Sequence, residues 1–486
     1  MSLAGRDPRG LGRHDSWEGV RAVVAGFGVS GFAAADNLLH LGAAVTALDE
    51  SLGDDERQER AELLRVLGAD IRLGTGETAQ LPTDIDVLVT SPGWRPSAPL
   101  LAQARDRGIP IWGEVELAWR LRDLDNAAPW LAITGTNGKT TTVQMLDTIL
   151  RTAGLRSVAV GNVGLPIVEA VMDPTPYDVF AVELSSFQLH YTDSMAAESA
   201  AVLNVAEDHL DWYPSMDAYA KDKGRIFERV QRACVYNAAD DVTRHLVEEA
   251  DVEEGARAIG FTLGMPGVGQ VGVVEDILVD RAFIAERQSS AAELCTIADL
   301  ASPAPHYVQN ALAAAALARA HGVSQQAVRD GLRAFRPDGH RIETVAAHAG
   351  ITWVDDSKAT NPHAAQASLQ AYDPVVWIAG GLAKGARFDE LVPAIAGRLR
   401  GVVLLGRDQD IIAGALARHA PDVPVIALPA DQTGAAAMGQ AVEAATRLAV
   451  TGDTVLLAPG CASQDQFRDY KARGDAFAAA VRAQIS

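Results

Sequence analysis

The stretch Ile133-Thr-Gly-Thr-Asn-Gly-Lys-Thr-Thr-Thr142 follows an apolar run at residues 130–133 and precedes a helical pattern. A glycine-rich turn between a strand and a helix points successive backbone N–H groups inward, and the helix adds the positive end of its dipole. The stretch therefore predicts a loop that binds phosphate, with Gly135 and Gly138 letting the backbone approach the oxygens. The plain alternative is an Asn-Gly turn that caps a helix.

The side chains of this loop fit a nucleoside triphosphate and a metal ion. Lys139 can reach the β- and γ-phosphates, and the Thr140 hydroxyl suits a Mg²⁺ position, so we expect ATP and Mg²⁺ as ligands. Ile133 stands where a standard P-loop has its first glycine, so this loop is shorter than the standard one. The expected ATP-binding residues of the loop are Gly135, Thr136, Asn137, Gly138, Lys139, Thr140 and Thr141.

Outward from the loop, the chain reads as three consecutive α/β domains at residues 1–128, 129–338 and 339–486. A chain of 486 residues exceeds what one hydrophobic core usually spans. The first domain reads as Rossmann-like and the second as a P-loop ATPase type with a parallel sheet, because its apolar runs are nearly continuous. The third domain reads as Rossmann-like and follows a linker at 335–339.

Apolar runs and helical patterns place individual elements. Strands are expected at 21–25, 44–48, 86–90, 130–133, 157–160, 179–182, 201–203, 234–236, 351–354, 375–379, 402–405, 425–428 and 454–458. Helices are expected at 217–231, 310–320 and, with Ser324 as N-cap, up to Leu332. Residues 251–302 are rich in valine and glycine and give no clear element.

Composition narrows the function further. The formal charge of −21, from 63 acidic and 42 basic residues, argues against a nucleic-acid surface. Three cysteines without metal-ligand spacing fit a reducing cytosol. Residues 1–19 read as a loose tail or short leader, and the apolar run at 311–318 is too short to span a membrane. We expect a cytoplasmic protein without nucleic-acid or membrane partners, and a monomer.

A second glycine-rich turn, Gly26-Phe-Gly-Val-Ser-Gly31, matches GxGxxG and is followed by Asp49, where a ribose-binding carboxylate would sit. Three interpretations are open: an NAD-dependent dehydrogenase, binding of a nucleoside diphosphate without redox chemistry, or simple turn packing. The separate ATP loop favours the second.

An ordered set of further motifs carries a family resemblance. The motifs are Gly161-Asn-Val-Gly164, Glu183-Leu-Ser-Ser-Phe-Gln188, Asn204-Val-Ala-Glu-Asp-His-Leu-Asp211, His340-Arg-Ile-Glu343, Asp356-Ser-Lys-Ala-Thr-Asn361 and Cys461-Ala-Ser-Gln-Asp-Gln-Phe467. Together with the loop, the set resembles the Mur ligases, cytoplasmic enzymes that build the peptide stem of peptidoglycan. It looks most like the member that adds D-glutamate.

The resemblance implies an activity and a catalytic set. ATP would phosphorylate the carboxylate of UDP-N-acetylmuramoyl-L-alanine, and the amine of D-glutamate would attack the acyl phosphate. Thr140 and Glu183 would hold one Mg²⁺, and His209 with a carbamylated Lys223 a second. Lys221 competes with Lys223 for that role. The implied catalytic residues are Lys139, His209, Lys223 and Lys358.

The resemblance also implies a set of binding residues for each of the three substrates. Asn310, Arg341 and Asp356 would complete the ATP site, and a hinge near 338–339 would bring Arg341 to it. The implied UDP-substrate residues are Val29, Ser30, Asp49, Gly93 and Asn162, and the implied D-glutamate residues are Thr360, Lys384, Ser463 and Tyr470. The sequence departs from the family pattern at Ser51, Tyr307, Leu382 and Tyr470.

Other functions remain open at this stage. Another Mur ligase and folylpolyglutamate synthetase share the chemistry, although the latter would be expected to start near the ATP loop. The dehydrogenase and a non-catalytic nucleotide sensor belong to other classes. Phosphate release that requires each substrate would separate them.

Overall fold

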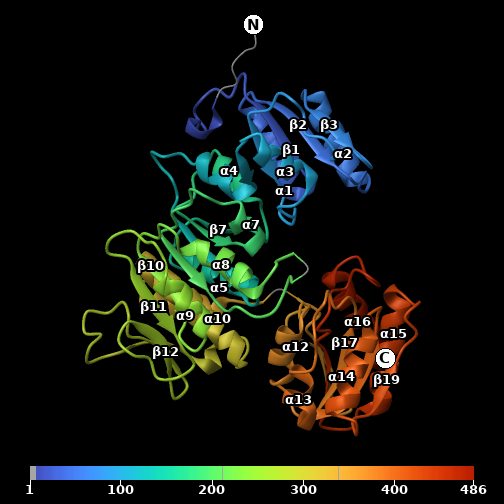
Figure 1. Ribbon diagram of the computed structural model, residues 1–486. Coiled ribbons are helices and arrows are strands. Elements are labelled where there is room, and N and C mark those ends of the chain that lie inside the picture. Colours follow the sequence, from blue (N-terminus) through green and yellow to red (C-terminus); the bar gives the residue numbers. More distant parts are fainter. Residues whose placement is uncertain (1–6, 211, 338, 486) are drawn as a thin grey trace. The chain divides into compact units, whose positions relative to one another are not determined.

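Three β-sheets flanked by helices make up the chain (Figure 1). The structure is a computed structural model that describes residues 7–210, 212–337 and 339–485. By compactness the chain divides into two units, of which the first holds two sheets and the second holds one. The first unit comprises Met1–Val205, Asp217–Leu300 and Gln309–Phe335, and the second comprises Ala206–Met216, Ala301–Val308 and Arg336–Ser486. The expected α/β class is confirmed.

The first sheet is parallel and has the strand order β3-β2-β1-β4-β5. Its elements are β1 (Arg21–Ala25), α1 (Val29–His40), β2 (Ala44–Asp49), α2 (Asp55–Val66), β3 (Asp70–Leu73), β4 (Val87–Thr90), α3 (Pro99–Asp106), β5 (Ile111–Gly113) and α4 (Glu114–Arg120). The strand order reverses between β1 and β4. Turns that follow these two strands meet at one edge, which is where ligands bind in open α/β sheets.

The second sheet has nine strands in the order β14-β13-β12-β11-β10-β9-β6-β8-β7. Its strands are β6 (Trp130–Thr134), β7 (Ser157–Gly161), β8 (Val179–Glu183), β9 (Ser199–Val202), β10 (Ala233–Asn237), β11 (Arg257–Phe261), β12 (Gln270–Val274), β13 (Ile277–Asp280) and β14 (Ala292–Thr296). Its helices are α5 (Lys139–Thr152), α6 (Ile167–Met172), α7 (Ser186–His190), α8 (Met216–Gly224), α9 (Asp241–Glu248), α10 (Pro305–His321) and α11 (Gln325–Ala334). Neighbours from β7 to β12 are parallel, and β13 and β14 extend the sheet antiparallel.

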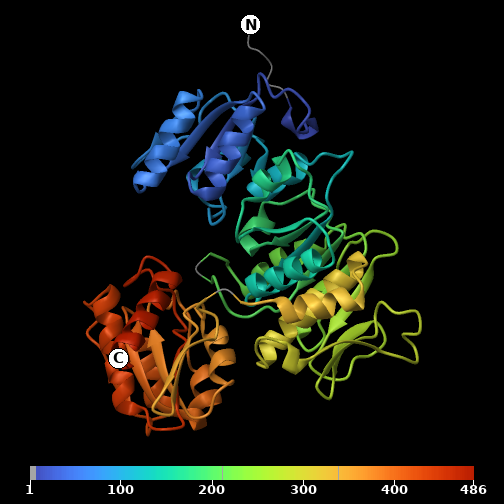
Figure 2. The same cartoon turned by 180° about the vertical axis from the view of Figure 1, so that it is seen from behind.

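The third sheet has the order β15-β16-β20-β17-β18-β19, with only the β15–β16 pair antiparallel. Its elements are β15 (Glu343–His348), β16 (Ile351–Asp355), α12 (Pro362–Leu369), β17 (Val375–Gly380), α13 (Leu391–Ile395), β18 (Leu399–Leu405), α14 (Gln409–His419), β19 (Val425–Ala427), α15 (Gly434–Leu448), β20 (Thr454–Leu457) and α16 (Tyr470–Ile485). Successive strand residues join different apolar clusters, as Trp377 and Ile378 do, because helices cover both faces (Figures 1 and 2).

One sequence prediction about local structure is wrong, and one segment without a predicted element forms strands. The helix expected at 217–231 ends earlier, because α8 stops at Gly224 and a single 3₁₀ turn at Arg225–Phe227 follows. Residues 251–302, which gave no clear element, contain the strands β11 to β14. Their valine and glycine content hides strand alternation, since β11 and β12 are buried between neighbours and the glycines lie at close backbone approaches, as Gly272 does to Gly264.

The N-terminal segment is packed, contrary to the loose tail expected from its polarity. Residues 1–6 lie outside the described residues, but Trp17 is fully buried and its backbone N–H donates to Leu41 O at 3.1 Å. Arg13 Nη1 donates to Val171 O at 2.9 Å, which lies in α6. The segment therefore contacts the end of α1, beside the first sheet, and α6, beside the second. Leu11 and Trp17 are both buried, so apolar side chains within the polar segment help to hold it in place.

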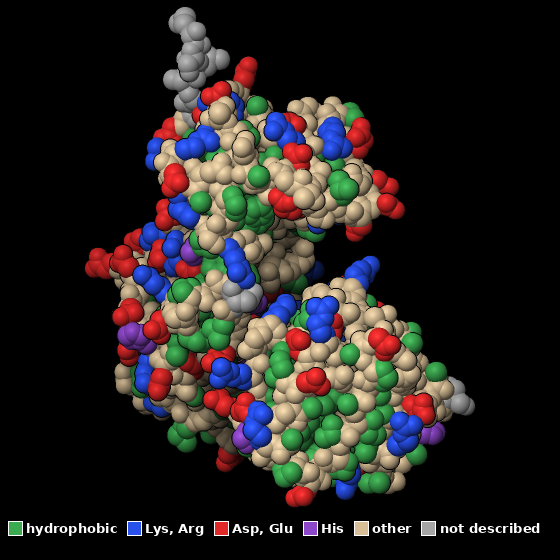
Figure 3. Space-filling model, turned by 45° about the vertical axis from the view of Figure 1, so that its right-hand side comes forward, with side chains coloured by type: hydrophobic (Ala, Val, Ile, Leu, Met, Phe, Trp, Pro, Cys, Tyr) green, Lys and Arg blue, Asp and Glu red, His purple; other side chains and the backbone are tan. Residues whose placement is uncertain are grey.

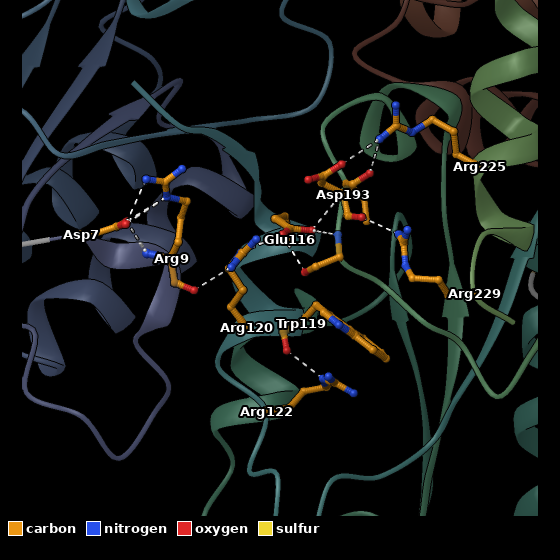
Figure 4. A network of polar contacts seen from close by, with 11 residues as sticks. Asp7, Arg9, Glu116, Trp119, Arg120, Arg122, Asp193, Arg225 and Arg229 are labelled. Carbon is orange, nitrogen blue, oxygen red and sulfur yellow. Dashed lines mark hydrogen bonds and ion pairs between the residues drawn. The ribbon is translucent and has the colours of Figure 1, made fainter. Parts of the chain in front are cut away.

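A buried carboxylate joins the two parts of the first unit (Figure 4). Glu116, on α4, is fully buried and accepts hydrogen bonds from the backbone N–H groups of Asp193 and Ser194 at 2.8 and 2.9 Å. Arg120 Nε donates to Glu116 Oε1 at 2.7 Å, and Arg120 Nη1 donates to Arg9 O at 2.9 Å. Burial alone would raise the pKa of Glu116, but these hydrogen bonds outweigh it and lower the pKa.

The apolar core of the first unit is continuous across this junction. Trp119 of α4 and Trp130 of β6 meet edge to face, with their ring centroids 4.9 Å apart.

No helix among the described residues is both long and apolar enough to cross a bilayer. Acidic and basic side chains are interspersed over the face shown in Figure 3.

Trp17→Ala tests the packed N-terminal segment. Loss of a fully buried indole should lower the free energy of unfolding by about 3–5 kcal/mol. Leu124→Ala, at a side chain that is 79% exposed, is the matched control and should change it by less than about 0.5 kcal/mol. Urea unfolding of both variants measures this, and equal stability of the Trp17→Ala variant and the unchanged chain would contradict the packing.

Candidate active site

The glycine-rich loop joins β6 to α5 as the sequence predicts, and Asn204 holds its backbone. Gly135 has φ +154° and Gly138, the N-cap of α5, has φ +84°, both in the region that favours glycine. Asn137 N donates to Asn204 Oδ1 at 2.9 Å, and Asn204 Nδ2 donates back to Asn137 O at 3.1 Å. Lys139 Nζ lies 2.9 Å from the loop carbonyls of Gly135 and Thr136. Thr140 and Thr141 occupy the first turn of α5.

Side chains from two other helices also hold the loop. Lys223 of α8 is buried, and its Nζ donates to Gly135 O at 2.9 Å. The Tyr219 hydroxyl lies 3.1 Å from Thr136 Oγ1. Asn310 of α10 packs so closely that a Cβ built on Gly138 would lie 2.4 Å from Asn310 Oδ1. The loop conformation is thus fixed by tertiary contacts as well as by its own glycines.

Glu183 offers an oxygen suited to a hard cation. It ends β8, beside β6, and is 1% exposed. Its Oε1 accepts a hydrogen bond from Asn162 Nδ2 at 2.8 Å, whereas its buried Oε2 accepts none from the described residues. An ionised carboxylate oxygen without a donor is a ligand that Mg²⁺ prefers. Asn162, predicted on the sugar side of the substrate, is therefore also tied to this carboxylate.

The other predicted metal ligands lie in different units. Lys223 belongs to the first unit and is buried, whereas its competitor Lys221 is exposed. His209 belongs to the second unit, where its Nε2 lies 3.7 Å from Asp208 Oδ2. Asp211 of the same motif lies outside the described residues. Among the residues the structure describes, no three His, Cys, Asp or Glu side chains gather as a metal site, so the second Mg²⁺ remains a prediction.

The predicted UDP-substrate residues lie at the switch point of the first sheet. Val29 and Ser30 follow β1, Gly93 follows β4, and Asp49 ends β2. Asp49 Oδ2 accepts from Phe27 N at 2.7 Å, so this carboxylate supports the GxGxxG turn itself. Arg57 of α2 lies 3.5 Å from the same oxygen. A basic residue therefore stands near Asp49 although Ser51 is not one.

The predicted D-glutamate residues share one edge of the third sheet. Thr360 follows β16, Lys384 follows β17, and Ser463 follows β20. These three strands are adjacent and parallel, so the loops after them emerge together. Tyr470 begins α16, and Lys358 Nζ lies 4.1 Å from its ring centroid. Leu382, at a departure from the family pattern, pairs through its backbone with Ala462.

The two remaining ATP candidates lie close together in the second unit. Asp356 is 7% exposed and accepts a hydrogen bond from the Ser368 hydroxyl. Burial raises the pKa of Asp356 to about 6, against the effect of Ser368 and of the nearby Arg341 charge. Asp338, at the predicted hinge, lies outside the described residues, so the hinge stays a prediction.

Three residues that shape these loops were missed from the sequence. Asn204 stands in the sequence analysis only as the first residue of a motif, and Tyr219 belongs to none of the motifs. Arg473 of α16 is 1% exposed and donates to Ser357 O at 2.8 Å and Cys461 O at 3.1 Å. Burial lowers the pKa of its guanidinium to about 10. The sole sequence signal for Arg473 is its place one helical turn after Tyr470.

The fold defines a three-sheet α/β protein with a glycine-rich loop after β6 and two Rossmann-like sheets. Three family models match most of the chain, between residues 20 and 461. The Mur ligase middle domain matches residues 133–318, the Mur ligase glutamate ligase domain residues 340–461, and the Mur ligase MurD-like N-terminal domain residues 20–113. The chain belongs to the Mur ligase family.

Curated relatives agree over nearly the full length. The UDP-N-acetylmuramoylalanine--D-glutamate ligase of Streptomyces avermitilis is 62% identical, covering 96% of this chain and 99% of that protein. The proteins of the same name from Thermobifida fusca and Mycolicibacterium smegmatis are 52% and 46% identical, each covering 96% of this chain and 98% and 97% of theirs.

Solved structures share the fold. UDP-N-acetylmuramate-alanine ligase MurC from Thermotoga maritima has a TM-score of 0.57 at 19% identity, covering 96% of this chain and 99% of that one. Folylpolyglutamate synthase from Mycobacterium tuberculosis, complexed with ADP and AMPPCP, has a TM-score of 0.52 at 17% identity, covering 74% of this chain and 92% of that one. These likenesses concern the fold alone.

Gly138→Ala tests whether the loop depends on the close approach of Asn310. The new methyl group would overlap Asn310 Oδ1, so ATP affinity should fall at least about tenfold. Gly154→Ala is the matched control, because Gly154 has nearly the same φ, +86°, and nothing within 4 Å of a built Cβ. Both variants carry the backbone cost of roughly 1–2 kcal/mol. Calorimetry with ATP should distinguish them, and equal affinities would contradict the steric argument.

Proposed function

We propose that this chain is an ATP-dependent ligase that joins D-glutamate to the L-alanine carboxylate of UDP-N-acetylmuramoyl-L-alanine in peptidoglycan precursor synthesis. The observation that carries the proposal is the 62% identity, over 96% of the chain, to a relative named for this reaction. The match of residues 20–113 to the MurD-like N-terminal domain favours this member over folylpolyglutamate synthase and over other Mur ligases.

The phosphate loop would position ATP for transfer to the substrate carboxylate. Phosphoryl transfer depends mostly on positioning and on neutralising charge. The backbone N–H groups of the loop face the phosphates, and Lys139 Nζ, which rests on two loop carbonyls, turns to the β- and γ-phosphates. The contacts with Asn204, Tyr219 and Asn310 hold the loop in this conformation before ATP binds. Asn310, Arg341 and Asp356 complete the nucleotide site in this proposal.

Glu183 and Thr140 would hold one Mg²⁺. The buried Glu183 Oε2 has no donor among the described residues, which supports its use as a ligand. Bound there, the ion would neutralise charge on the phosphate oxygens. For a second Mg²⁺ we propose His209 and a carbamate on Lys223. The nitrogen of a carbamate keeps one N–H, so the hydrogen bond to Gly135 O could persist while the new oxygens face the metal.

The two other substrates would lie at the carboxyl edges of the first and third sheets. Val29, Ser30, Asp49 and Gly93 border the switch point proposed for the UDP moiety, with Asn162 nearer Glu183. D-glutamate carries two carboxylates, which cations and hydroxyl groups bind well. Thr360, Lys384, Ser463 and Tyr470 supply such groups, and Lys358, stacked on Tyr470, adds a further cation.

Omitting substrates one at a time tests the reaction directly. Phosphate should be released from ATP only when both UDP-N-acetylmuramoyl-L-alanine and D-glutamate are present. L-glutamate, L-alanine and a diamino acid in place of D-glutamate should give little release, because the amino-acid site is specific. Equal release with any of them would instead favour another ligase of the family. No release under any condition would favour a nucleotide sensor.

Lys223→Ala tests the carbamate. Turnover should fall by at least the roughly 10–100-fold that loss of a residue supporting a metal costs. Added bicarbonate should not restore it, since no amine remains to react. Lys221→Ala, two positions away and exposed, is the matched control and should retain turnover. A Lys223→Ala enzyme with near-unchanged activity would remove Lys223 from the site.

A further inference from the structure

A second concave site lies at the edge of the central sheet opposite the phosphate loop. Its volume is about 250 Å³, and Arg232, Glu254, Arg257 and Phe283 are among the residues that line it. Arg232 directly precedes β10 and Arg257 begins β11, so both lie at the amino ends of parallel strands. The phosphate loop follows the carboxyl end of β6, which runs in the same direction. The two sites are therefore separate.

Two guanidinium groups meet at the Ala282 carbonyl beside this pocket: that of Arg257, which lines the pocket, and that of Arg287, which is not among its lining residues. Arg257 Nη1 and Arg287 Nη1 both donate to the same carbonyl oxygen, that of Ala282, at 3.0 and 3.5 Å. Among the described residues neither Arg257 nor Arg287 forms an ion pair, and the Asp280 carboxylate, whose charge acts on Arg257, is held by Arg319 at 3.0 Å. Burial and the charge of Arg287 lower the pKa of Arg257, against the opposite effect of the Asp280 carboxylate. Two like charges held this close repel each other, and a bound anion would remove that repulsion.

Two neighbouring arginines, Arg281 and Arg232, add further positive charge near the pocket. Arg281 donates only to carbonyl oxygens in the hydrogen bonds described, those of Pro266, Arg287 and Gln288. Arg232 lies 3.8 Å from Glu198, whose carboxylate is held more closely by His321 at 2.8 Å. In a chain with a net charge of −21, a pocket whose charged lining residues are two arginines and one glutamate is locally positive.

We propose that this pocket binds a small phosphate-bearing anion. Guanidinium groups present paired N–H donors that match phosphate oxygens, and they do so better than lysine ammonium groups. The Phe283 ring lies 5.0 Å from the Arg257 guanidinium carbon and fixes the plane of that group. The volume is at the small end for ligand pockets, which fits a diphosphate or a phosphorylated metabolite rather than a whole nucleotide. Glu254, the one acidic residue lining the pocket, is exposed and can turn to solvent.

Titration with inorganic pyrophosphate tests the site on the full chain. With the phosphate loop saturated by ADP and the switch point of the first sheet saturated by UDP, calorimetry should detect one further pyrophosphate site in the unchanged chain. Arg257→Gln with Arg287→Gln should weaken that site at least about tenfold, because both guanidinium groups at the Ala282 carbonyl are lost. Arg287→Gln alone, at a half-buried surface side chain, should weaken it in the same direction and serves if the double variant fails to fold.

Arg447→Gln is the matched control. Arg447 is an exposed arginine of α15 that pairs with Glu443, and its loss changes the net charge equally without touching the pocket. It should leave pyrophosphate affinity unchanged. Absence of a further site in the unchanged chain, equal affinity in Arg287→Gln, or an equal loss in Arg447→Gln would each overturn the proposal. ADP affinity, measured alongside, should be the same in all variants.

Discussion

The hydrogen bonds from Asn204 and Lys223 to the backbone of the glycine-rich loop are the constraint on which the central site depends. A loop that offers its N–H groups to phosphate must keep its own carbonyl oxygens occupied elsewhere. Lys139 and Lys223 share the Gly135 carbonyl, and Asn204 pairs with both polar groups of the Asn137 backbone. The glycines allow this loop conformation, and the hydrogen bonds from these side chains stabilise it.

The same geometric rule places all three candidate substrate regions. In each sheet, the loops that carry the predicted residues follow the carboxyl ends of adjacent parallel strands. In the first sheet, the Asp49 carboxylate supports the glycine-rich turn after β1. In the second sheet, the loop after β6 lies beside Glu183. In the third sheet, the buried Arg473 donates hydrogen bonds to the loops after β16 and β20. Regular strand packing therefore supplies the positions, while a buried polar side chain at each edge fixes the local conformation.

Buried charge has different consequences at different places in this chain. Glu116 is satisfied by backbone N–H groups and by Arg120, and it joins the N-terminal part to the central sheet. Glu114, two residues earlier, accepts from Val168 N, but burial raises its pKa to about 7. Glu183 keeps one oxygen without a donor among the described residues. A buried carboxylate with incomplete hydrogen bonding is costly unless a cation joins it, which distinguishes a candidate ligand from a structural acid.

The sequence by itself determined the α/β class, most strands, and the loop at 133–142, because continuous apolar runs and glycine spacing are local signals. It also determined the family through ordered motifs. Only the tertiary structure decided that the N-terminal segment is packed through Trp17, that 251–302 forms strands, and that Arg473 is buried. These depend on partners distant in sequence, which no local pattern records. For the loop, glycine spacing predicted phosphate binding, whereas its fixed shape follows from contacts with Asn204, Tyr219 and Asn310, which lie 67 or more residues away.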